Sequence, residues 1–254
     1  MKEIISFIKK SRIYIVIFNL IKKMISVIIP TYNEKKNINK ILNKLLKVKK
    51  ISEIIFVDDR STDGTYSEIQ KFSKNKVKGY LRNSKQRDLS KSVLYGVKKS
   101  KSKLTLVMDC DLQHNPKYIE KMYSLFEKKK SDIVIASRFG DSSYEGNLGF
   151  FRSLISNFAI EFINFTLGKK SFDPLSGFFL CKKNMITKYE SNFFKRGYKI
   201  LFDIIYNGKK NIKIKHVKIH FNKRIYESSK FNITVVVLFL AQILHTLLVV
   251  KKIK

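Results

Sequence analysis

The chain has 254 residues, 44% of them hydrophobic, which is enough for one large α/β domain or two small ones with a sizeable core. Three prolines and ten glycines argue against long disordered linkers. The only cysteines, Cys110 and Cys181, exclude a disulfide framework and favour a reducing compartment. The formal net charge of +32 indicates an anionic partner: nucleic acid, acidic lipid headgroups or a phosphorylated substrate.

The distribution of this charge narrows the choice of partner. Lysines are spread along the whole chain instead of forming one block with stacking aromatics, which disfavours a nucleic-acid-binding protein. Most of them are expected to be solvated on helix faces. Arginine is scarce, at eight residues, and its planar guanidinium grips phosphate in a way that lysine does not. Arg138, Arg152 and Arg224 are therefore candidate phosphate ligands.

Residues 1–23 contain an apolar stretch, 13–20, with basic residues around it. The stretch is too short to span a bilayer, and no small-residue cleavage site follows it as in a signal peptide. We expect an amphipathic segment that lies on a surface.

Apolar strands then alternate with amphipathic helices. The expected strands are 24–30, 53–58, 77–82, 104–109 and 132–137. The expected helices are 37–50, 65–72, 90–99 and one that begins at Pro116, where proline suits the first turn. This order predicts an α/β fold with a mostly parallel, doubly wound sheet. Ligands of such sheets bind beyond the carboxyl ends of the strands.

The second half of the chain has a different pattern. Its expected elements are a long amphipathic helix at 151–167, a strand at 178–181, a helix at 198–206, a strand at 212–221 and a basic loop at 222–230. Residues 231–250 carry no formal charge and precede a basic tail. Their length suffices to span a bilayer.

The polar residues of this last segment fall near one face of a helix, which suits a helix lying in the membrane plane equally well. They are Asn232, Gln242, His245 and Thr246. A buried core helix is the third reading. We expect residues 231–254 to form a membrane-associated or transmembrane helix with a basic tail.

The carboxyl ends of the expected strands carry the chemistry. Asp109 and Asp111 end the strand at 104–109, and because side chains alternate in an extended segment they can point the same way. Two converging carboxylates suit a hard divalent cation that carries phosphate oxygens. A bare pair of this kind is more often a surface loop, so the other strand ends must decide.

The first two strand ends add candidates for binding a nucleoside. In residues 28–34 (IIPTYNE), Tyr32 offers a ring face for a base and Glu34 offers an acceptor. In residues 57–65 (VDDRSTDGT), a carboxylate can accept from the ring N–H of uracil or guanine. The alternatives there are a simple turn at residues 63–64 and an Asp58 that only caps the next helix.

Together the three strand ends resemble the nucleotide-binding half of the family 2 glycosyltransferases, which have the GT-A fold. Four segments are also similar to the polyprenyl-phosphate branch of this family, the dolichyl-phosphate mannose synthases. They are 109–116 (DCDLQHNP), 173–179 (DPLSGFF), 197–201 (GYKIL) and 221–230 (FNKRIYESSK). The resemblance implies a catalytic domain of Rossmann-like GT-A fold over residues 24–230.

The resemblance also implies a role for individual residues. Those implied to hold the nucleotide sugar are Pro30, Tyr32, Glu34, Val57, Asp59, Asp109, Cys110, Asp111, Gln113, Arg138, Lys199, Arg224 and Lys230. Those implied to bind Mg²⁺ or Mn²⁺ are Asp109, Asp111 and Gln113. Those implied at the acceptor phosphate are Arg138, Arg152 and Ser156, and those implied as catalytic are Asp111, Arg138 and Arg152.

The implied reaction is an inverting, metal-dependent transfer of mannose from GDP-mannose to dolichyl or another polyprenyl phosphate. A phosphate monoester is mostly anionic near neutral pH, so no general base is needed and the histidines need no catalytic role. The alternative in the same class is a UDP-glucose-dependent polyprenyl-phosphate glucosyltransferase. The alternative from another class is a basic nucleic-acid-binding protein.

The partners implied besides the two substrates are a membrane surface and small membrane-anchoring subunits, without nucleic acid. The implied location is a membrane, with the catalytic domain in the cytosol. That would be the cytosolic face of the endoplasmic reticulum in a eukaryote or the inner face of the plasma membrane in a prokaryote.

Three residues depart from the family pattern. Asp88 stands where the family usually has a small residue, Glu227 where it has glycine, and Cys110 where it has alanine. A carboxylate at position 88 would repel phosphate unless it points away from the pocket.

Overall fold

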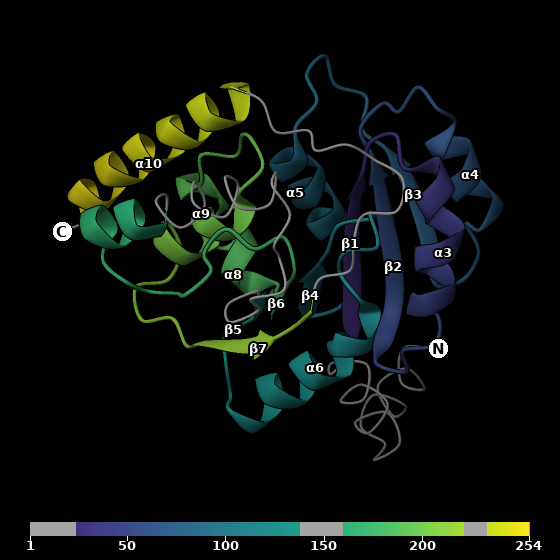
Figure 1. The fold of residues 1–254 in the computed structure, drawn as a ribbon, viewed down its shortest axis with the longest axis horizontal. Coiled ribbons are helices and arrows are strands. Elements are labelled where there is room, and N and C mark those ends of the chain that lie inside the picture. The colour runs from purple at the N-terminus through teal and green to yellow at the C-terminus, as the bar shows by residue number, and fades with distance from the viewer. Residues whose placement is uncertain (1–23, 138–159, 221–232, 254) are drawn as a thin grey trace, which may run out of the picture.

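A seven-stranded sheet forms the centre of the computed structural model, which describes residues 24–137, 160–220 and 233–253 (Figure 1). Its strands are β1 (Ile25–Thr31), β2 (Ile51–Asp58), β3 (Val77–Leu81), β4 (Leu104–Val107), β5 (Ile133–Ser137), β6 (Phe179–Lys182) and β7 (Ile214–Lys218). Their order across the sheet is β3-β2-β1-β4-β6-β5-β7. The mostly parallel α/β sheet that the sequence predicts is confirmed.

One strand runs against the others: β6 is antiparallel to both β4 and β5. Its first residue, Phe179, pairs with Val107 of β4 and with Ile135 of β5. Because β6 is reversed, the loop that precedes it, residues 173–178, reaches the edge where β1, β2 and β4 have their carboxyl ends. This reversal therefore brings a segment from the second half of the chain to the predicted ligand edge.

Helices cover both faces of the sheet (Figure 1). The helices are α3 (Lys35–Leu45), α4 (Thr65–Lys71), α5 (Leu89–Lys99), α6 (Ile119–Lys128), α8 (Asn184–Thr187), α9 (Ile200–Tyr206) and α10 (Ile233–Ile253). Residues 160–167 are also helical, and short 3-10 turns occupy Pro116–Tyr118 and Glu190–Asn192. The first apolar cluster lies under α3, α4 and α6, and the second under α5, α8, α9 and α10.

Apolar periodicity explains how the helices attach. The buried apolar side chains of α3 recur at helical spacing, as expected for a helix with one face on a sheet. They are Ile38, Ile41, Leu42 and Leu45. On the other face α5 lies close to β1, because a Cβ on Gly96 would stand 2.6 Å from the Cγ2 of Ile28. This close approach holds the start of α5 near the ends of β1 and β2.

The predicted elements of residues 24–220 are confirmed with small shifts in their ends. The largest difference is α3, which ends at Leu45 although the sequence predicts a helix to residue 50. Strand β7 ends at Lys218 instead of residue 221, β4 at Val107 instead of residue 109, and α9 begins at Ile200 instead of residue 198. Of the helix predicted at 151–167, the described part, 160–167, is helical. The amphipathic segment predicted at 1–23 and the positions of Asn232 and Glu227 lie outside the described residues.

Helix α10 packs on the second apolar cluster through its polar side and presents apolar residues outward. Gln242, Ile243 and Thr246 are buried. A stripe of four residues is more than half exposed: Val237, Leu240, Leu244 and Leu248. In the described ranges, no helix reaches the combination of length and hydropathy that a bilayer crossing requires.

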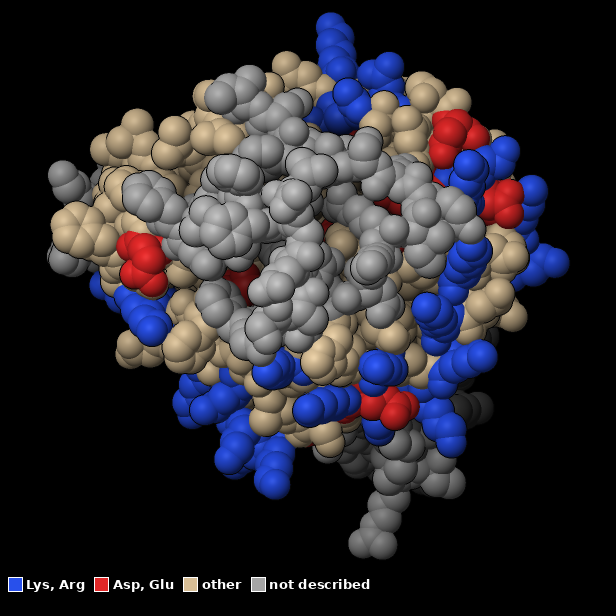
Figure 2. Space-filling view, viewed as in Figure 1, with Lys and Arg blue, Asp and Glu red and all other residues tan. Residues whose placement is uncertain are grey.

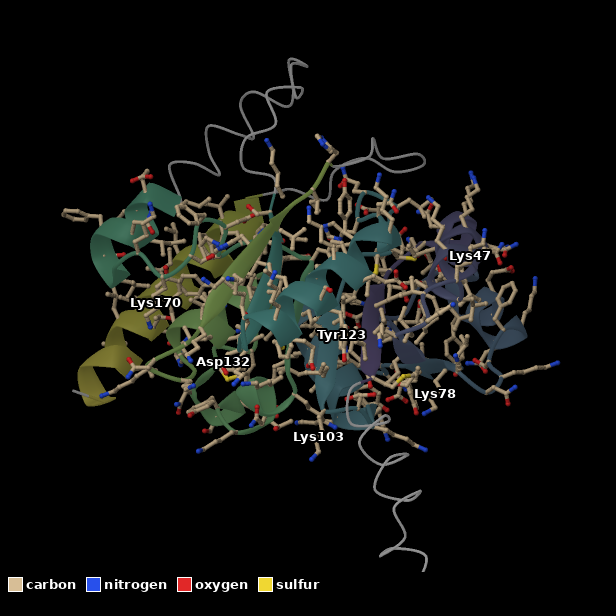
Figure 3. All side chains as sticks on the ribbon, turned by 90° about the horizontal axis from the view of Figure 1, so that it is seen from below. Lys47, Lys78, Lys103, Tyr123, Asp132 and Lys170 are labelled. Carbon is tan, nitrogen blue, oxygen red and sulfur yellow. The ribbon has the colours of Figure 1, made fainter. Side chains whose placement is uncertain are left out.

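Charged side chains do not gather in one patch on the face shown in Figure 2. Lys and Arg lie around its rim, and the surface over α10 at the upper left is tan. At the amino ends of the strands, acidic residues are held in buried hydrogen-bonded clusters. Asp132, labelled near Lys103 along the lower edge of Figure 3, accepts from Lys182 Nζ at 2.7 Å and from Lys209 Nζ at 3.0 Å. Burial raises the pKa of Asp132, but these hydrogen bonds outweigh it and hold the pKa below its usual value.

Candidate functional site

The register of the strands brings the predicted polar segments to one edge of the sheet. Thr31 of β1 pairs with Asp58 of β2, and Asp58 pairs with Leu81 of β3. Ile28 of β1 pairs with Val107 of β4. The segments that follow these strands, 32–34, 59–64, 82–88 and 108–114, therefore start at the same edge, as expected for an open parallel sheet.

Asp58 is a structural residue of this edge. Its side chain is fully buried and accepts from the Ser61 amide at 2.9 Å, the Ser61 hydroxyl at 2.5 Å and the Thr31 hydroxyl at 3.4 Å. The Ser61 hydroxyl in turn accepts from the Asn33 amide at 2.8 Å. The prediction that Asp58 caps the next helix is wrong, because the N-cap of α4 is Gly64 and no side chain caps it. The Asp58 carboxylate instead closes the turn after β2.

The loops after β1 and β2 stiffen each other. Glu34 donates its amide to the Thr65 hydroxyl at 2.8 Å, and its carboxylate accepts from Asn37 Nδ2 at 2.7 Å. Asp63 accepts from the amides of Thr65 at 2.9 Å and Lys35 at 3.1 Å. Burial raises the pKa of Asp63, but these hydrogen bonds outweigh it and hold the pKa below its usual value. The predicted acceptor Glu34 is thus held in place by local contacts.

Asp59, a predicted ligand of the nucleoside, forms a buried ion pair with Arg82. Arg82 Nη2 donates to Asp59 Oδ1 at 2.5 Å, and the Asp88 amide donates to Asp59 Oδ2 at 2.6 Å. Arg82 Nε also donates to the Ser92 hydroxyl at 3.1 Å. Breaking a buried pair of this kind by removing one partner costs about 3–5 kcal/mol. Arg82 is not among the predicted site residues, although arginine is as scarce there as at Arg138, which was a candidate for that reason.

Arg87 was missed in the same way. Its guanidinium carbon lies 4.1 Å from the centre of the Tyr32 ring, within the range of a cation–π contact. The Tyr32 ring, which the sequence analysis offers as a face for a base, therefore already has the Arg87 guanidinium on one face. Of the other two residues predicted there, Pro30 is half-buried at the end of β1, and Val57 is fully buried in the second apolar cluster.

The acidic pair after β4 lies in a turn with an unusual backbone. Asp111 is buried and its Oδ1 accepts from the Gln113 amide at 3.1 Å. Leu112 between them has φ = +62°, a left-handed conformation that costs a non-glycine residue roughly 1–2 kcal/mol. Cys110, which separates the two acids, is a buried free thiol. The strained turn directs the chain so that Asp111 and Gln113 meet.

Asp109 is the more accessible of the two acids, with 37% of its side chain exposed. Its amide donates to Nδ1 of His114 at 3.0 Å, so Nδ1 carries no proton and His114 is neutral. The 3.6 Å distance between this Nδ1 and Asp109 Oδ2 is therefore a contact with a neutral ring and not an ion pair. The buried His114 ring also packs on Phe178, with centres 5.1 Å apart. His114 is thus structural, as predicted.

The loop before β6 packs directly on Asp109. A Cβ on Gly177 would lie 2.8 Å from Asp109 Oδ2 and 3.3 Å from His114 Cε1, so only glycine leaves room for this carboxylate. Ser176 fixes the loop by donating its hydroxyl to the Ala136 carbonyl at 2.9 Å. The sequence analysis recognised the 173–179 segment as a motif, but no role was assigned to its glycine.

Lys199 lies next to the same loop. Its Nζ donates to the Leu175 carbonyl at 3.2 Å, and its own carbonyl accepts from Gln242 Nε2 of α10 at 3.1 Å. The remaining predicted site residues lie outside the described residues: Arg138, Arg152, Ser156, Arg224 and Lys230.

The donor set at the end of β4 fits a hard cation. Two carboxylates and an amide oxygen are ligands that Mg²⁺ and Mn²⁺ accept, and Mg²⁺ is commonly held by one or two carboxylates with substrate phosphates. The part of the chain that the structure describes has no cluster of three or more His, Cys, Asp or Glu that could hold a metal ion alone.

Comparisons with known proteins agree with this geometry. The model of the family described as glycosyl transferase family 2 matches residues 26–190. A dolichol-phosphate mannosyltransferase of Pyrococcus furiosus is 36% identical over 210 residues, which cover 81% of this chain and 58% of that protein. Proteins with the same name from Saccharomyces cerevisiae and Mycosarcoma maydis are 28% and 29% identical, covering 86% and 87% of this chain and 85% and 78% of theirs. The chain thus spans little more than half the length of the archaeal relative.

Solved structures share the fold at low sequence identity. Glucosyl-3-phosphoglycerate synthase from Mycobacterium tuberculosis, solved with Mn²⁺, UDP-glucose and phosphoglyceric acid, has a TM-score of 0.64 at 16% identity, covering 89% of this chain and 83% of that one. Mannosyl-3-phosphoglycerate synthase from Rubrobacter xylanophilus has a TM-score of 0.61 at 15% identity, covering 80% and 70%. These likenesses show that the fold is shared.

Proposed function

Because the chain belongs to glycosyl transferase family 2, we propose that it transfers mannose from GDP-mannose to dolichyl or another polyprenyl phosphate, with inversion at the anomeric carbon. Relatives that carry the name dolichol-phosphate mannosyltransferase support the choice of reaction. The observation that carries it is the Asp109–Asp111 turn at the carboxyl end of β4, with the Gly177 loop packed on it.

In this proposal Asp109, Asp111 and Gln113 hold Mg²⁺ or Mn²⁺ together with the donor diphosphate. Such an ion, when bound, would stabilise the negative charge that develops on the leaving diphosphate. A solved structure of the same fold that contains Mn²⁺ supports a metal ion in this proposal. The task of the chain's own residues is to keep both carboxylates at the end of β4, to which the turn at Leu112 and the missing side chain of Gly177 contribute.

The nucleoside is proposed to bind over the loops after β1 and β2. Tyr32 and Arg87 together present a ring and a cation, and Glu34 presents a fixed acceptor. Each oxygen of Asp59 already accepts one hydrogen bond, but a carboxylate oxygen has two lone pairs, so Asp59 can still accept from the nucleoside. The ion pair with the buried Arg82 holds this carboxylate in place. Pro30, Val57 and Cys110 are also proposed to lie at the donor site.

The acceptor needs no base, because its phosphate oxygen is already an anion when it attacks the anomeric carbon. The residues proposed to surround the donor and acceptor phosphates are Arg138, Arg152, Ser156, Lys199, Arg224 and Lys230. The positive charge of the five Arg and Lys residues lets two mutually repelling anions approach each other, and Ser156 offers a hydroxyl donor.

The test of this function is a transfer assay with the full chain in detergent micelles, with dolichyl phosphate and labelled GDP-mannose or UDP-glucose. We expect labelled lipid only from GDP-mannose, and no product when chelator removes Mg²⁺ and Mn²⁺. Transfer only from UDP-glucose would contradict the sugar, and undiminished transfer in chelator would contradict the metal. Absence of transfer together with salt-sensitive RNA binding would favour the nucleic-acid alternative.

We further propose that α10 lies flat on the membrane instead of crossing it. The stripe Val237, Leu240, Leu244 and Leu248 faces outward, while Gln242 and Thr246 hydrogen bond to the catalytic domain. A crossing helix would give up these hydrogen bonds, and the buried Asp203 and Asn207 would each lose one of several partners, at about 1 kcal/mol for each hydrogen bond. Immersing the stripe adds up to about 1.5–3 kcal/mol per side chain. Phe165, 90% exposed, lies on the helical residues 160–167 that pack on the same cluster.

Replacing the stripe should therefore release the protein from membranes. We expect the triple variant Leu240→Ser, Leu244→Ser, Leu248→Ser to lose at least about tenfold in partitioning to anionic vesicles, measured by flotation, because three apolar side chains no longer leave water. The matched control is Leu46→Ser with Leu81→Ser, which changes two exposed leucines on α3 and β3. Equal partitioning of the triple variant and the control would refute the flat orientation.

The location follows from the same proposal. The catalytic domain is proposed to face the cytosol, and the buried free thiols of Cys110 and Cys181 support a reducing compartment. Small membrane-anchoring subunits remain part of the proposal as partners that would strengthen the attachment made by α10.

A further inference from the structure

The segment 194–199, which precedes α9 and ends in Lys199, is tied to distant parts of the chain by its backbone. Phe194 donates its amide to Asp203 Oδ1 at 3.1 Å. Gly197 donates its amide to Asp88 Oδ2 at 2.8 Å, and its carbonyl accepts from the Ser90 amide at 3.0 Å. This segment therefore rests on the start of α5.

Asp88 uses both oxygens of a buried carboxylate. Its Oδ1 accepts from the Lys91 amide at 3.0 Å and caps α5, and its Oδ2 accepts from Gly197, which is 109 positions away in sequence. Burial raises the pKa of Asp88, and the hydrogen bonds from Lys91 and Gly197 oppose that rise. The Asp88 carboxylate, which would repel phosphate if it pointed into the pocket, instead points toward the backbone amides of Lys91 and Gly197.

The backbone of Asp88 extends the connection to the nucleotide side. Its amide donates to Asp59, the partner of Arg82. On the other side, Gly197 has φ = +84°, a conformation that glycine adopts without strain and that sets the direction in which the chain enters Lys199. Lys199 Nζ contacts Leu175 in the loop that contains Gly177. A continuous set of contacts thus runs from Asp59 to the loop over Asp109.

We propose that Asp88 is a positioning residue for donor binding: by holding the Gly197 amide it fixes the direction of the chain at Lys199, the residue proposed to bind the donor diphosphate. The activity part of this inference rests on the proposed function. Helix capping alone does not explain the arrangement, because a cap needs one acceptor oxygen, and serine or asparagine would supply it. The second oxygen serves the contact with Gly197.

The test uses Asp88→Ser in the full chain. Serine keeps one oxygen for the Lys91 amide but lacks the second acceptor. We expect the KM for GDP-mannose to rise about tenfold or more, the loss that follows from one hydrogen bond to a charged group, with a KM for the lipid phosphate close to that of the unchanged chain. Hydrogen exchange of the Gly197 amide should accelerate, while that of Lys91 stays slow. Asp88→Asn, nearly the same in shape, should show both effects if the serine variant fails to fold.

The matched control is Asp132→Asn, which alters another buried carboxylate with several donors, at the opposite edge of the sheet. It should lower the melting temperature without changing either KM. Unchanged KM for GDP-mannose in Asp88→Ser, with accelerated Gly197 exchange, overturns the positioning role. If hydrogen exchange of the Gly197 amide is unchanged in Asp88→Ser, the hydrogen bond between Gly197 and Asp88 does not hold this segment. If the KM for GDP-mannose rises equally in Asp132→Asn, the effect is not specific to Asp88. Absence of transfer by the unchanged chain would count against the proposed function, while the exchange measurement still tests the tether.

Discussion

Replacing Asp111 by alanine is expected to reduce sugar transfer by about a hundredfold to a thousandfold, the range seen when one group that stabilises charge in a transition state is removed. Asp111 lies in the turn after β4, where its carboxylate meets the Gln113 amide. Alanine removes one of the two carboxylates proposed to hold the ion. Because the turn lies outside the strands, the sheet should stay intact. The measurement is the initial rate of transfer at saturating Mg²⁺ or Mn²⁺, with thermal unfolding as a check of the fold.

A control for this variant is Glu68→Gln, which removes a carboxylate that pairs with Lys71 on the surface of α4. Surface pairs of this kind contribute little, so the control should keep its rate and its unfolding temperature. Titration calorimetry of donor binding with and without metal separates the cause of the loss. A transfer rate for Asp111→Ala close to that of the unchanged chain would contradict the proposed metal chemistry.

Replacing Gly177 by alanine should impair donor binding with little loss of stability. The new Cβ would stand 2.8 Å from Asp109 Oδ2, a distance that one of the two groups must relieve. The carboxylate is the end of a side chain that can rotate, so we expect it to turn out of its place rather than the loop to unfold. The expected result is a rise of at least about tenfold in the metal concentration that half-saturates transfer, equal to ~1.4 kcal/mol.

The comparison variant is Gly168→Ala. Gly168 has φ = +79°, a positive value that Gly177 does not share, and nothing lies within 4 Å of the place where its Cβ would stand. It therefore carries the backbone cost of alanine without a steric clash and should bind metal as the unchanged chain does. If Gly177→Ala needs no more metal than Gly168→Ala, the packing of the 173–178 loop on Asp109 has no part in the reaction.

These two predictions bear on what a sequence motif can reveal. Alternation along an extended segment singled out Asp109 and Asp111, and the family resemblance added Gln113. Strand β4 nevertheless ends at Val107, so both acids lie in the turn that follows it and not in a strand. The requirement for glycine at position 177 arises from a loop that enters the site from the reversed strand β6. A side-chain clash between segments more than 60 positions apart leaves no mark on local periodicity, so the motif was visible and its reason was not.

Helix α10 illustrates the same limit. The sequence places Gln242, His245 and Thr246 near one face of α10, and it leaves open whether that face meets water, lipid or protein. In the structure Asn207 Nδ2 donates to the Thr246 hydroxyl at 2.9 Å, and Gln242 reaches Lys199. The polar face is used for attachment to the catalytic domain, and the apolar stripe faces outward. The packed side also contains Ile243, with Phe239 and Leu247 against the second apolar cluster, so α10 has apolar residues on both sides.

Strand and helix order, the α/β class and the position of the acidic pair all follow from local patterns of apolar side chains and turn residues, which is why the chain alone predicts them. The partners of Asp59, Asp88 and Gly177 lie from 23 to 109 positions away or across a strand reversal, and they meet only because the sheet aligns the ends of its strands. Such contacts depend on packing between elements, and many sequences with the same periodicity would pack differently. That Arg82 pairs with Asp59 and that Gly197 donates to Asp88 is therefore decided by the tertiary structure and not by the local sequence.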